Sequence, residues 1–513
     1  MKNILALLFI FLCGVALYTL TIKGVVGNAD NIQEISQLTS ATQPFETSHE
    51  RASYSQFLAI TQLHQFDLPK VLADFSTPDV GYFKGKFFSY FPPGISFFII
   101  PFYSFGSRYN LGLVFSFASV ALLSVFSLLL LYKILRNIFK APIWASLAAV
   151  IIYGFATTSW SYSNTIYQHG PTVFLLAFAF YSVWKYKQHK ALSWLWGAGA
   201  WLAYGLSFFF DYPNAILLLP IMVYFLLVSL SVFKNEEGGY KINFRVAILA
   251  TFSVFLVISG LHLYYNKINF GTPIKFSNTL PRYGIINLDK LENSDVSATS
   301  TPDVGGAIGV FHETNVPNSF FELTVAPDKG LFVFSPILLL ALLGVYFVIR
   351  KGATMETGTV LALATVDFFT YVSFGDPWGG WAFGPRYLIP AMFSCSILVG
   401  IALSEVKKGK GILLKLLTFV LFAYSSAVAL LGALTTNAVP PKVEAVYFHI
   451  KYGFLYDLDY LKQGKSGSFI FNSYASHYMN LKEYFLLIYG ALLLIMFVIL
   501  FIISHFEKDE PKS

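Results

Sequence analysis

The sequence predicts an all-α protein that crosses a membrane many times, and three observations support this prediction. The chain is 56% hydrophobic and only 12% charged, whereas soluble domains carry about 25% charged residues. Several runs reach the ~20 apolar residues that a helix needs to span the hydrocarbon core. Backbone groups inside lipid must be paired within their own segment, so these runs are expected to be helices.

Twelve apolar segments are candidate spans, with boundaries defined to within a few residues. They cover residues 4–24, 110–132, 142–160, 171–187, 191–210, 213–233, 246–265, 331–349, 357–375, 387–405, 411–433 and 483–504. The predicted fold class is therefore an all-α polytopic membrane protein of about 12 transmembrane helices, with long outer loops that carry interfacial helices.

The positions of Lys and Arg predict the orientation of the chain, because these residues collect on the cytoplasmic side. If the N-terminus is cytoplasmic, every short inner connection is basic. These residues are Lys133, Arg136, Lys140, Lys185, Lys187, Lys190, Lys234, Lys241, Arg245, Arg350, Lys351, Lys407, Lys408 and Lys410. We therefore expect a multi-pass plasma (inner) membrane protein with both termini cytoplasmic. The net charge of +7 reflects this orientation, and no nucleic-acid partner is expected.

The first span could instead be a cleaved signal peptide. Its apolar run is long and no clear small-x-small cleavage site follows it, so we expect it to be retained. We divide the chain into a transmembrane module over 1–433, which includes the outer loops 25–109 and 266–330, and a second part over 434–513. This second part contains an outer loop, the last transmembrane helix and a short cytoplasmic tail. Residues 91–106 are apolar, too short to span and bounded by prolines, which predicts an interfacial helix.

Candidate chemistry concentrates on the outer side, where polar groups close to lipid are costly and so suggest function. The first outer loop carries Glu50 in the stretch ETSHERASY, and Asp79 further on. Partial desolvation raises the pKa of such a carboxyl and suits it to act as a general base. Lys84 and Lys86 precede the apolar 91–106 segment and could contact a lipid phosphate. A solvated loop with snorkelling lysines is the alternative reading.

The stretch WGGWAFGPRYLIP at 378–390 places one cation, Arg386, among glycines and tryptophans at the start of a predicted span. A guanidinium is always charged and binds phosphate oxygens in a bidentate way. Trp378 and Trp381 suit stacking on a sugar, and they equally suit an interfacial aromatic belt beside a snorkelling arginine. Residue chemistry alone leaves both alternatives open.

Two further polar residues lie at outer helix ends. A lone His such as His169 is more often structural than a ligand, and Asp211 in FDYPN fits a helix cap or turn. The sequence lacks a phosphate-binding Gly-rich Lys-Ser/Thr loop, a His-Glu-x-x-His motif and paired cysteines, so no metal site is predicted. A divalent ion held by His169 and an acid is the open alternative.

The order of these motifs along the chain resembles that in the GT-C superfamily, the integral-membrane glycosyltransferases that use polyprenyl-phosphate sugars. Protein O-mannosyltransferases and the lipid A aminoarabinose transferase belong to it. The resemblance covers about residues 40–405. It rests on four segments in this order: YFKGKFFSYFPPGISFFIIPFY, FGTPIKFSN, DKGLFVFSP and WGGWAFGPRYLIP.

The resemblance implies an inverting transfer of a sugar from a polyprenyl-phosphate donor to an acceptor hydroxyl on the outer face. It implies that Glu50 is the base, although the family usually shows Asp or Asp-Glu where this chain has His49-Glu50; Glu46 is the rival. It also implies that Asp79 is a second acid and that Arg386 binds the lipid phosphate, assisted by Lys84 or Lys86. The candidate substrate-binding residues are Tyr387, Trp381, His169 and Asp211.

The donor sugar is not specified by these residues, and the acceptor is a protein, a lipid or a glycan. The alternative function is a polytopic transporter or flippase for a lipid-linked or sugar substrate. Transporters tend to carry internal repeats and polar residues at the midplane. No repeat is evident here, and the polar residues cluster at one face.

Overall fold

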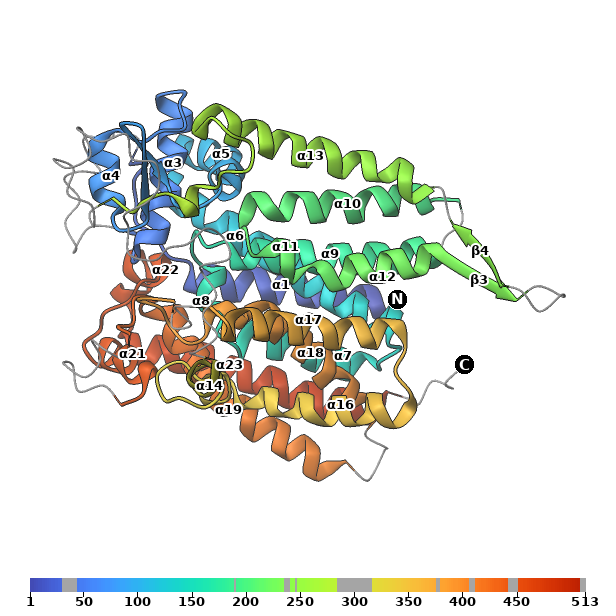
Figure 1. Ribbon diagram of the computed structural model, residues 1–513. Coiled ribbons are helices and arrows are strands. Elements are labelled where there is room, and N and C mark those ends of the chain that lie inside the picture. The colour runs from blue at the N-terminus through green and yellow to red at the C-terminus, as the bar shows by residue number, and fades with distance from the viewer. Residues whose placement is uncertain are drawn as a thin grey trace.

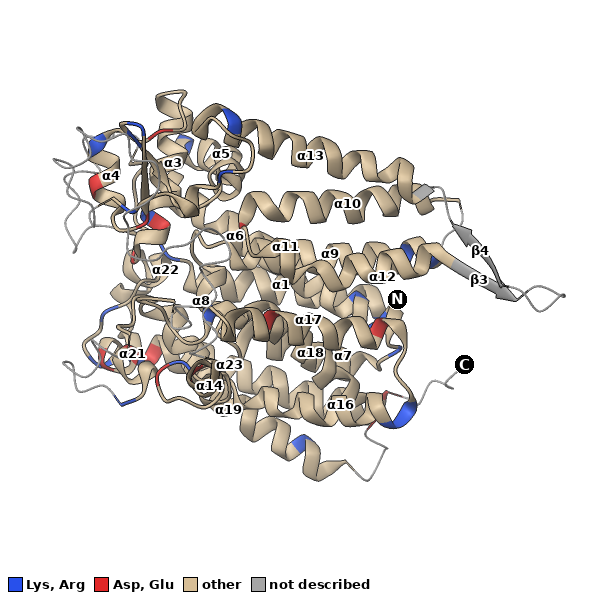
Figure 2. Ribbon diagram, viewed as in Figure 1, with Lys and Arg blue, Asp and Glu red and all other residues tan. Residues whose placement is uncertain are grey.

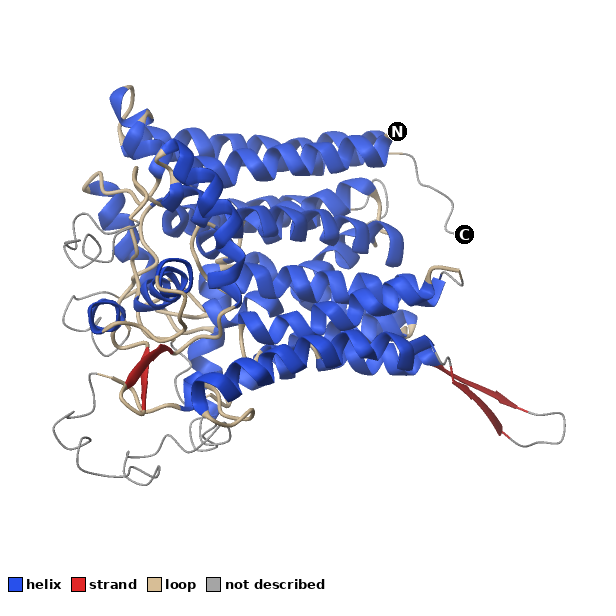
Figure 3. Cartoon of the chain, turned by 90° about the horizontal axis from the view of Figure 1, so that it is seen from above, coloured by secondary structure: helices blue, strands red, loops and turns tan. Residues whose placement is uncertain are grey.

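The protein is described here from a computed structural model. Long helices lie side by side and form the body of the molecule, whereas short helices and loops gather at one end (Figure 1). Both chain termini lie at the opposite end (Figures 1 and 3). The structure describes residues 1–29, 44–188, 191–234, 240–244, 247–283, 316–374, 379–405, 411–441 and 451–507.

Each of the twelve predicted spans contains a helix in the described part of the chain. These helices are α1 (Lys2–Thr21), α6 (Gly112–Lys133), α7 (Ile143–Phe155), α9 (His169–Gln188), α10 (Ser193–Phe210), α12 (Leu219–Ser229), α13 (Ala247–Phe270), α16 (Leu340–Lys351), α17 (Met355–Val372), α18 (Ile389–Ser404), α19 (Ile412–Leu434) and α23 (Leu481–Phe497). Among the described residues, six segments are long and apolar enough to cross a membrane, those of α1, α6, α13, α18, α19 and α23. A mostly helical, multi-pass membrane protein is thus confirmed, while the count of twelve spans stays a prediction.

Charged residues concentrate at the two ends of the bundle, and the middle of the helices carries few of them (Figure 2). Buried hydrophobic residues form one large cluster that runs through the bundle, with α6, α7, α9 and α18 near its centre. This distribution is expected for helices whose flanks face lipid and whose ends reach water.

The third predicted span, 142–160, is interrupted near its C-terminal end. Helix α7 stops at Phe155, and a separate short helix, α8 (Ser159–Ser163), follows. Two side chains hold this region against the end of α1, because Trp160 Nε1 and Asn164 Nδ2 donate to Thr21 Oγ1 at 3.0 and 2.7 Å. The interruption brings the segment that begins with α8 toward the end of the bundle that carries the short helices, where the candidate site lies (Figure 1).

The end of the bundle opposite the termini contains the short helices that the loop composition predicted (Figure 1). They are α3 (Ser48–Gln62), α4 (Lys70–Ser76), α5 (Gly94–Gly106), α14 (Val316–Thr324), α15 (Leu331–Phe334), α21 (Gly453–Lys462) and α22 (Phe469–Ser473). The apolar 91–106 segment does form a helix, α5, which packs against α3, α6 and α10. Its placement along a membrane surface stays a prediction.

Two β-hairpins interrupt the predicted all-α fold. Strands β1 (Val80–Phe83) and β2 (Lys86–Ser89) pair antiparallel across a turn in which Lys84 and Gly85 have φ of +48° and +79°. Such left-handed turn residues match the twist of a two-residue hairpin. Strands β3 (Leu230–Lys234) and β4 (Tyr240–Phe244) project from the end that carries the termini (Figure 1). The predicted span to residue 233 was therefore too long, because the helix ends at Ser229.

Candidate active site

Glu50 is the third residue of α3 and closes a capping box at the start of this helix. Its Oε2 accepts hydrogen bonds from the backbone N–H groups of Glu46 at 2.7 Å and Thr47 at 3.0 Å. The side chain is fully buried, and Oε1 has no hydrogen-bond partner among the described residues. Burial first, and then the negative charge of Glu46, raises the pKa of Glu50 to about 7, although Lys23 lowers it. A carboxyl with this pKa can accept a proton at neutral pH.

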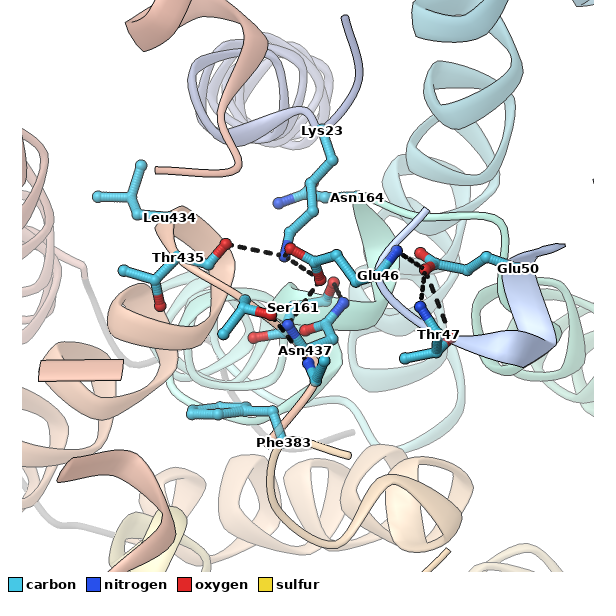
Figure 4. Close-up of polar contacts among 12 residues, drawn as sticks. Lys23, Glu46, Thr47, Glu50, Ser161, Asn164, Phe383, Leu434, Thr435 and Asn437 are labelled. Carbon is cyan, nitrogen blue, oxygen red and sulfur yellow. Dashed lines mark hydrogen bonds and ion pairs between the residues drawn. The ribbon is translucent and has the colours of Figure 1, made fainter. Parts of the chain in front are cut away.

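Glu46, the rival for the role of base, is occupied by other contacts. Its two carboxylate oxygens lie 2.8 and 2.7 Å from Lys23 Nζ. The backbone N–H of Asn437 donates to Oε2 at 2.6 Å (Figure 4). Glu46 is thus held by three short contacts, whereas Glu50 keeps one carboxylate oxygen, Oε1, without a hydrogen-bond partner among the described residues.

Asp79 lies directly before β1 and close to the first turn of α3. Its Oδ2 accepts a hydrogen bond of 2.6 Å from Ser48 Oγ, and the side chain is half-buried. The structure therefore brings the two predicted acids, Glu50 and Asp79, to the same helix end. Asp79 is the more accessible of the two.

A chain of hydrogen bonds connects Arg386 to the residues that hold Glu50. Arg386 Nη1 donates to Tyr167 Oη at 3.1 Å, and Tyr167 Oη lies 2.6 Å from Thr47 Oγ1. Thr47 in turn supplies one of the N–H groups that bind Glu50. The guanidinium carbon also lies 5.3 Å from the centre of the Tyr167 ring, a cation–π distance. Residues far apart in the sequence thus form one site.

The loop before Arg386 is fixed by buried polar contacts to its backbone. Lys329 Nζ donates to the carbonyl oxygen of Ala382. Tyr162 Oη donates to the carbonyl oxygen of Phe383 at 3.0 Å and accepts from the N–H of the same residue at 2.9 Å. The DKGLFVFSP motif therefore has a structural task that its residue chemistry did not reveal, since its lysine holds the arginine loop.

Gly384 is required by both conformation and space. Its φ is +60°, and a Cβ at this position would lie 2.6 Å from Thr158 Cγ2 and 2.9 Å from Phe334 Cδ1. A side chain would therefore have to displace its neighbours and adopt a left-handed backbone. This close approach sets where the chain turns before Arg386.

Aromatic rings line the site on both sides of Tyr167. The His49 ring stacks on the Tyr167 ring, with centroids 4.4 Å apart and an interplanar angle of 7°. The centroids of the His49 and Phe91 rings lie 3.8 Å apart. His169 is nearly parallel to Tyr167 at 5.9 Å. Burial, followed by the charges of Arg386 and His169, holds the pKa of His49 well below its usual range. This ring is therefore neutral and apolar in character.

His169 and Asp211 were predicted as substrate-binding residues, and both lie in this cluster. His169 begins α9, is 3% exposed, and its Nε2 has no hydrogen-bond partner among the described residues. Asp211 follows α10 and accepts a hydrogen bond of 3.2 Å from Gln168 Nε2. Burial raises the pKa of Asp211 to about 6, although Gln168 and Arg386 lower it. Arg386 therefore interacts with the carboxylate of Asp211 as well as with the hydroxyl of Tyr167.

Tyr387 and Trp381 occupy different environments. Tyr387 stacks on Tyr371 with centroids 4.5 Å apart and an interplanar angle of 1°, and its ring centre lies 5.2 Å from the Arg386 guanidinium carbon. It therefore supports the arginine. Trp381 is 39% exposed on the loop surface, and Trp378 lies outside the described residues.

Lys84 and Lys86 lie at the turn end of the β1–β2 hairpin. Asp79 precedes the other end of β1, and a strand of four residues spans roughly 13 Å. Lys86 Nζ pairs with Asp67 at 3.0 Å, and Lys84 Nζ lies over the Phe83 ring. The contacts of the described residues do not bring either lysine to Arg386.

Sequence reasoning missed several residues of the site. Arg282 lies beside β1, its guanidinium carbon 4.8 Å from the centre of the Tyr90 ring. The pKa of Arg282 is raised: burial lowers it, but the interactions with Tyr90 and Asp79 outweigh burial, so this second cation lies near Asp79. It follows FGTPIKFSN by four residues, and its charge was the available signal.

Asp367 was also missed, although an acid within a predicted span is itself a signal. This residue of α17 is 1% exposed, and its Oδ2 accepts a hydrogen bond of 2.8 Å from the backbone N–H of Ala391. A carboxylate is favourable at the N-terminus of a helix, so Asp367 fixes the start of α18 directly after Arg386.

The described residues contain no group of three or more His, Cys, Asp or Glu side chains placed to hold a metal ion. His169 and Asp211 both face Arg386, whose positive charge disfavours a second cation there. A divalent metal stays an untested alternative.

Comparisons with known proteins agree with this architecture. A family model described as dolichyl-phosphate-mannose-protein mannosyltransferase matches residues 92–258. ArnT from Cupriavidus metallidurans bound to undecaprenyl phosphate is 12% identical with a TM-score of 0.50, over 96% of this chain and 76% of that chain. Its apo state is 13% identical with a TM-score of 0.47, over the same shares. The apo oligosaccharyltransferase of Archaeoglobus fulgidus is 13% identical with a TM-score of 0.42, over 89% of this chain and 59% of that chain.

No curated protein matches the sequence. The family match contains Tyr167, His169 and Asp211, whereas Glu50 and Arg386 lie outside it. The likeness to ArnT extends over nearly the whole chain and shows a common fold. The family match and the fold shared with ArnT confirm the predicted resemblance to the GT-C superfamily of membrane glycosyltransferases.

Proposed function

We propose that this protein is a glycosyltransferase that moves a sugar from a polyprenyl-phosphate donor to an acceptor hydroxyl at the outer face of the membrane, with inversion at the anomeric carbon. The observation that carries the proposal is the series of hydrogen bonds between the Glu50 carboxylate and the Arg386 guanidinium. The Thr47–Tyr167–Arg386 chain links the residue that holds Glu50 to the guanidinium.

Each partner has the chemistry that the transfer needs. Glu50 Oε1 takes the proton of the acceptor hydroxyl as the acceptor oxygen bonds to the anomeric carbon. The bond from that carbon to the phosphate oxygen breaks, and polyprenyl phosphate leaves with the electron pair. Arg386 stabilises the negative charge that develops on this phosphate. Arg282, which interacts electrostatically with Asp79 and Tyr387, supplies a second positive charge near the site.

The donor class is supported by two lines of evidence. A solved structure with the same fold, ArnT, is bound to undecaprenyl phosphate, and the family model that matches is named for a dolichyl-phosphate-mannose donor. The outer-face location is supported by the basic residues of the predicted inner connections. We do not favour the transporter alternative, because the polar groups described above cluster at one end of the bundle.

The test uses purified full-length protein and a panel of polyprenyl-phosphate sugars, with release of polyprenyl phosphate as the readout. Glu50→Gln and Arg386→Ala are each expected to lower kcat at least 100-fold while the protein stays folded. Asp459→Asn and Arg108→Ala are matched controls, because they remove the same charges from exposed positions.

Two outcomes would change the assignment. If turnover survives Glu50→Gln and is lost in Asp79→Asn, the more accessible acid is the base. If no donor of the panel binds or turns over, the glycosyltransferase proposal is wrong, and the resemblance is one of fold alone.

A further inference from the structure

A buried ion pair lies immediately behind the carboxylate of Glu50. Lys23, two residues beyond α1, reaches Glu46, whose backbone N–H binds Glu50 (Figure 4). The Lys23 side chain is 1% exposed and that of Glu46 is 16% exposed. The free energy lost when two charges are removed from water offsets most of their mutual attraction. Stability alone therefore does not explain why an ion pair is buried at this place.

The pair also joins the site to the last outer loop. Lys23 Nζ donates to the carbonyl oxygen of Thr435 at 3.2 Å, and the N–H of Asn437 donates to Glu46 Oε2. Thr435 Oγ1 donates to Asp457 Oδ1 at 2.8 Å. A Cβ on Gly467 would lie only 3.2 Å from Glu46 Oε1. Residues from both predicted parts of the chain therefore enclose the same pair.

We propose that Lys23 and Glu46 are a positioning pair that fixes the orientation and the charge of the Glu50 carboxylate. The inference rests on the proposed function, because it assigns Glu50 the role of base. Glu46 is held by its side chain, so its N–H and that of Thr47 point at Glu50 Oε2. Oε1 is then the oxygen left to accept a proton.

The two members of the pair act on Glu50 with opposite signs. The charge of Glu46 disfavours the ionised form of Glu50, and the charge of Lys23 favours it. Among the described residues, Arg51 from its own helix and Tyr167 from the segment before α9 also interact electrostatically with Glu50. Asp457 faces the pair from α21. Removing the charge of Lys23 should therefore raise the pKa of Glu50, and removing the charge of Glu46 should lower it.

The experiment compares Lys23→Met, Glu46→Gln and the double variant with the wild type. The acidic limb of the kcat–pH profile should move to higher pH by about one unit or more in Lys23→Met, and to lower pH in Glu46→Gln. At a pH below this limb, a one-unit upward shift is about a tenfold loss of kcat. The double variant should return the limb close to its wild-type position, and Lys23→Arg should preserve it. A pair with only a structural role would lower kcat equally at every pH.

A second readout does not depend on turnover. Dicyclohexylcarbodiimide modifies buried carboxyls in their protonated form, so the pH dependence of labelling at Glu50, measured by peptide mass spectrometry, reports its ionisation directly. Labelling should persist to higher pH in Lys23→Met and end at lower pH in Glu46→Gln. If Lys23→Met does not fold, the pH dependence of labelling can still be compared between the wild type, Glu46→Gln and the double variant.

The two proposals fail in different ways. Labelling that shifts as expected in a protein that turns over no donor would support the pair and overturn the proposed function. Turnover in the wild type, together with pH profiles and labelling curves that do not move in any variant, would overturn the positioning pair. Shifts of the same sign in both single variants would also overturn it.

Discussion

Replacing Tyr167 by Phe tests the link between the base and the phosphate-binding arginine. The variant keeps the ring that stacks on His49 and removes only the hydroxyl. That hydroxyl accepts from Arg386 Nη1 at 3.1 Å and lies 2.6 Å from Thr47 Oγ1. The guanidinium then loses one of the contacts that fix its direction, and Thr47 loses a partner next to Glu50.

The size of the effect follows from the charged partner. A hydrogen bond to a charged group contributes about 1.5–3 kcal/mol, and about 1.4 kcal/mol corresponds to a tenfold change. We therefore expect kcat/KM for the donor to fall roughly tenfold to hundredfold. The aromatic contacts of the ring do not change, so the apparent melting temperature should fall by only a few degrees.

The assay measures release of polyprenyl phosphate across donor concentrations for the wild type and Tyr167→Phe. Tyr181→Phe is the matched control, because it removes a buried hydroxyl near the other end of α9, where Asn137 Nδ2 donates to it at 2.8 Å. If Tyr167→Phe retains full kcat/KM, the hydrogen-bonded chain does not contribute to catalysis. Equal losses in both variants would indicate a general effect of removing a buried hydroxyl.

Three other perturbations test the scaffold around the site. Gly384→Ala should destabilise the protein by about 2–5 kcal/mol, from left-handed backbone strain and the clash with Thr158 Cγ2 at 2.6 Å, and thermal unfolding in detergent measures this; an unchanged melting temperature would contradict the packing described. Lys329→Met removes the tether to the Ala382 carbonyl oxygen and should lower kcat about tenfold, with donor KM as the companion readout; normal kinetics would show that the loop keeps its shape without it. Burial raises the pKa of Asp457 from 3.8 to about 8, so the folded state binds the proton more tightly, and stability should fall as pH rises from about 4 to about 8. Melting curves of Asp457→Asn should lose that part of the slope, and an identical slope would show that the carboxyl is not perturbed.

The class of the protein and the segments that form the site could be predicted from residue types and their order along the chain. Composition and the length of apolar runs are enough to predict helices in lipid, because the bilayer leaves the backbone few alternatives. The motif order led to Glu50, Asp79 and Arg386, and the structure brings these three into one region. Charge and residue type are visible in a sequence, so these positions could be found.

Which of the candidate groups contact one another became visible only once the chain was folded. Residue type alone does not separate Glu46 from Glu50. They differ in the structure because Lys23, two residues after α1, and the backbone N–H of Asn437 both bind the carboxylate of Glu46. Tyr167 carries no sequence signal, since a tyrosine at a helix end is common, yet its hydroxyl joins the two halves of the site. Lys86 looked suitable by charge, and the geometry of the hairpin turns it toward Asp67. Each of these hydrogen bonds and ion pairs depends on a distance of a few ångströms between residues that are separated in the chain, by 19 positions for Asp67 and Lys86 and by 391 for Glu46 and Asn437, and residue type does not specify those distances.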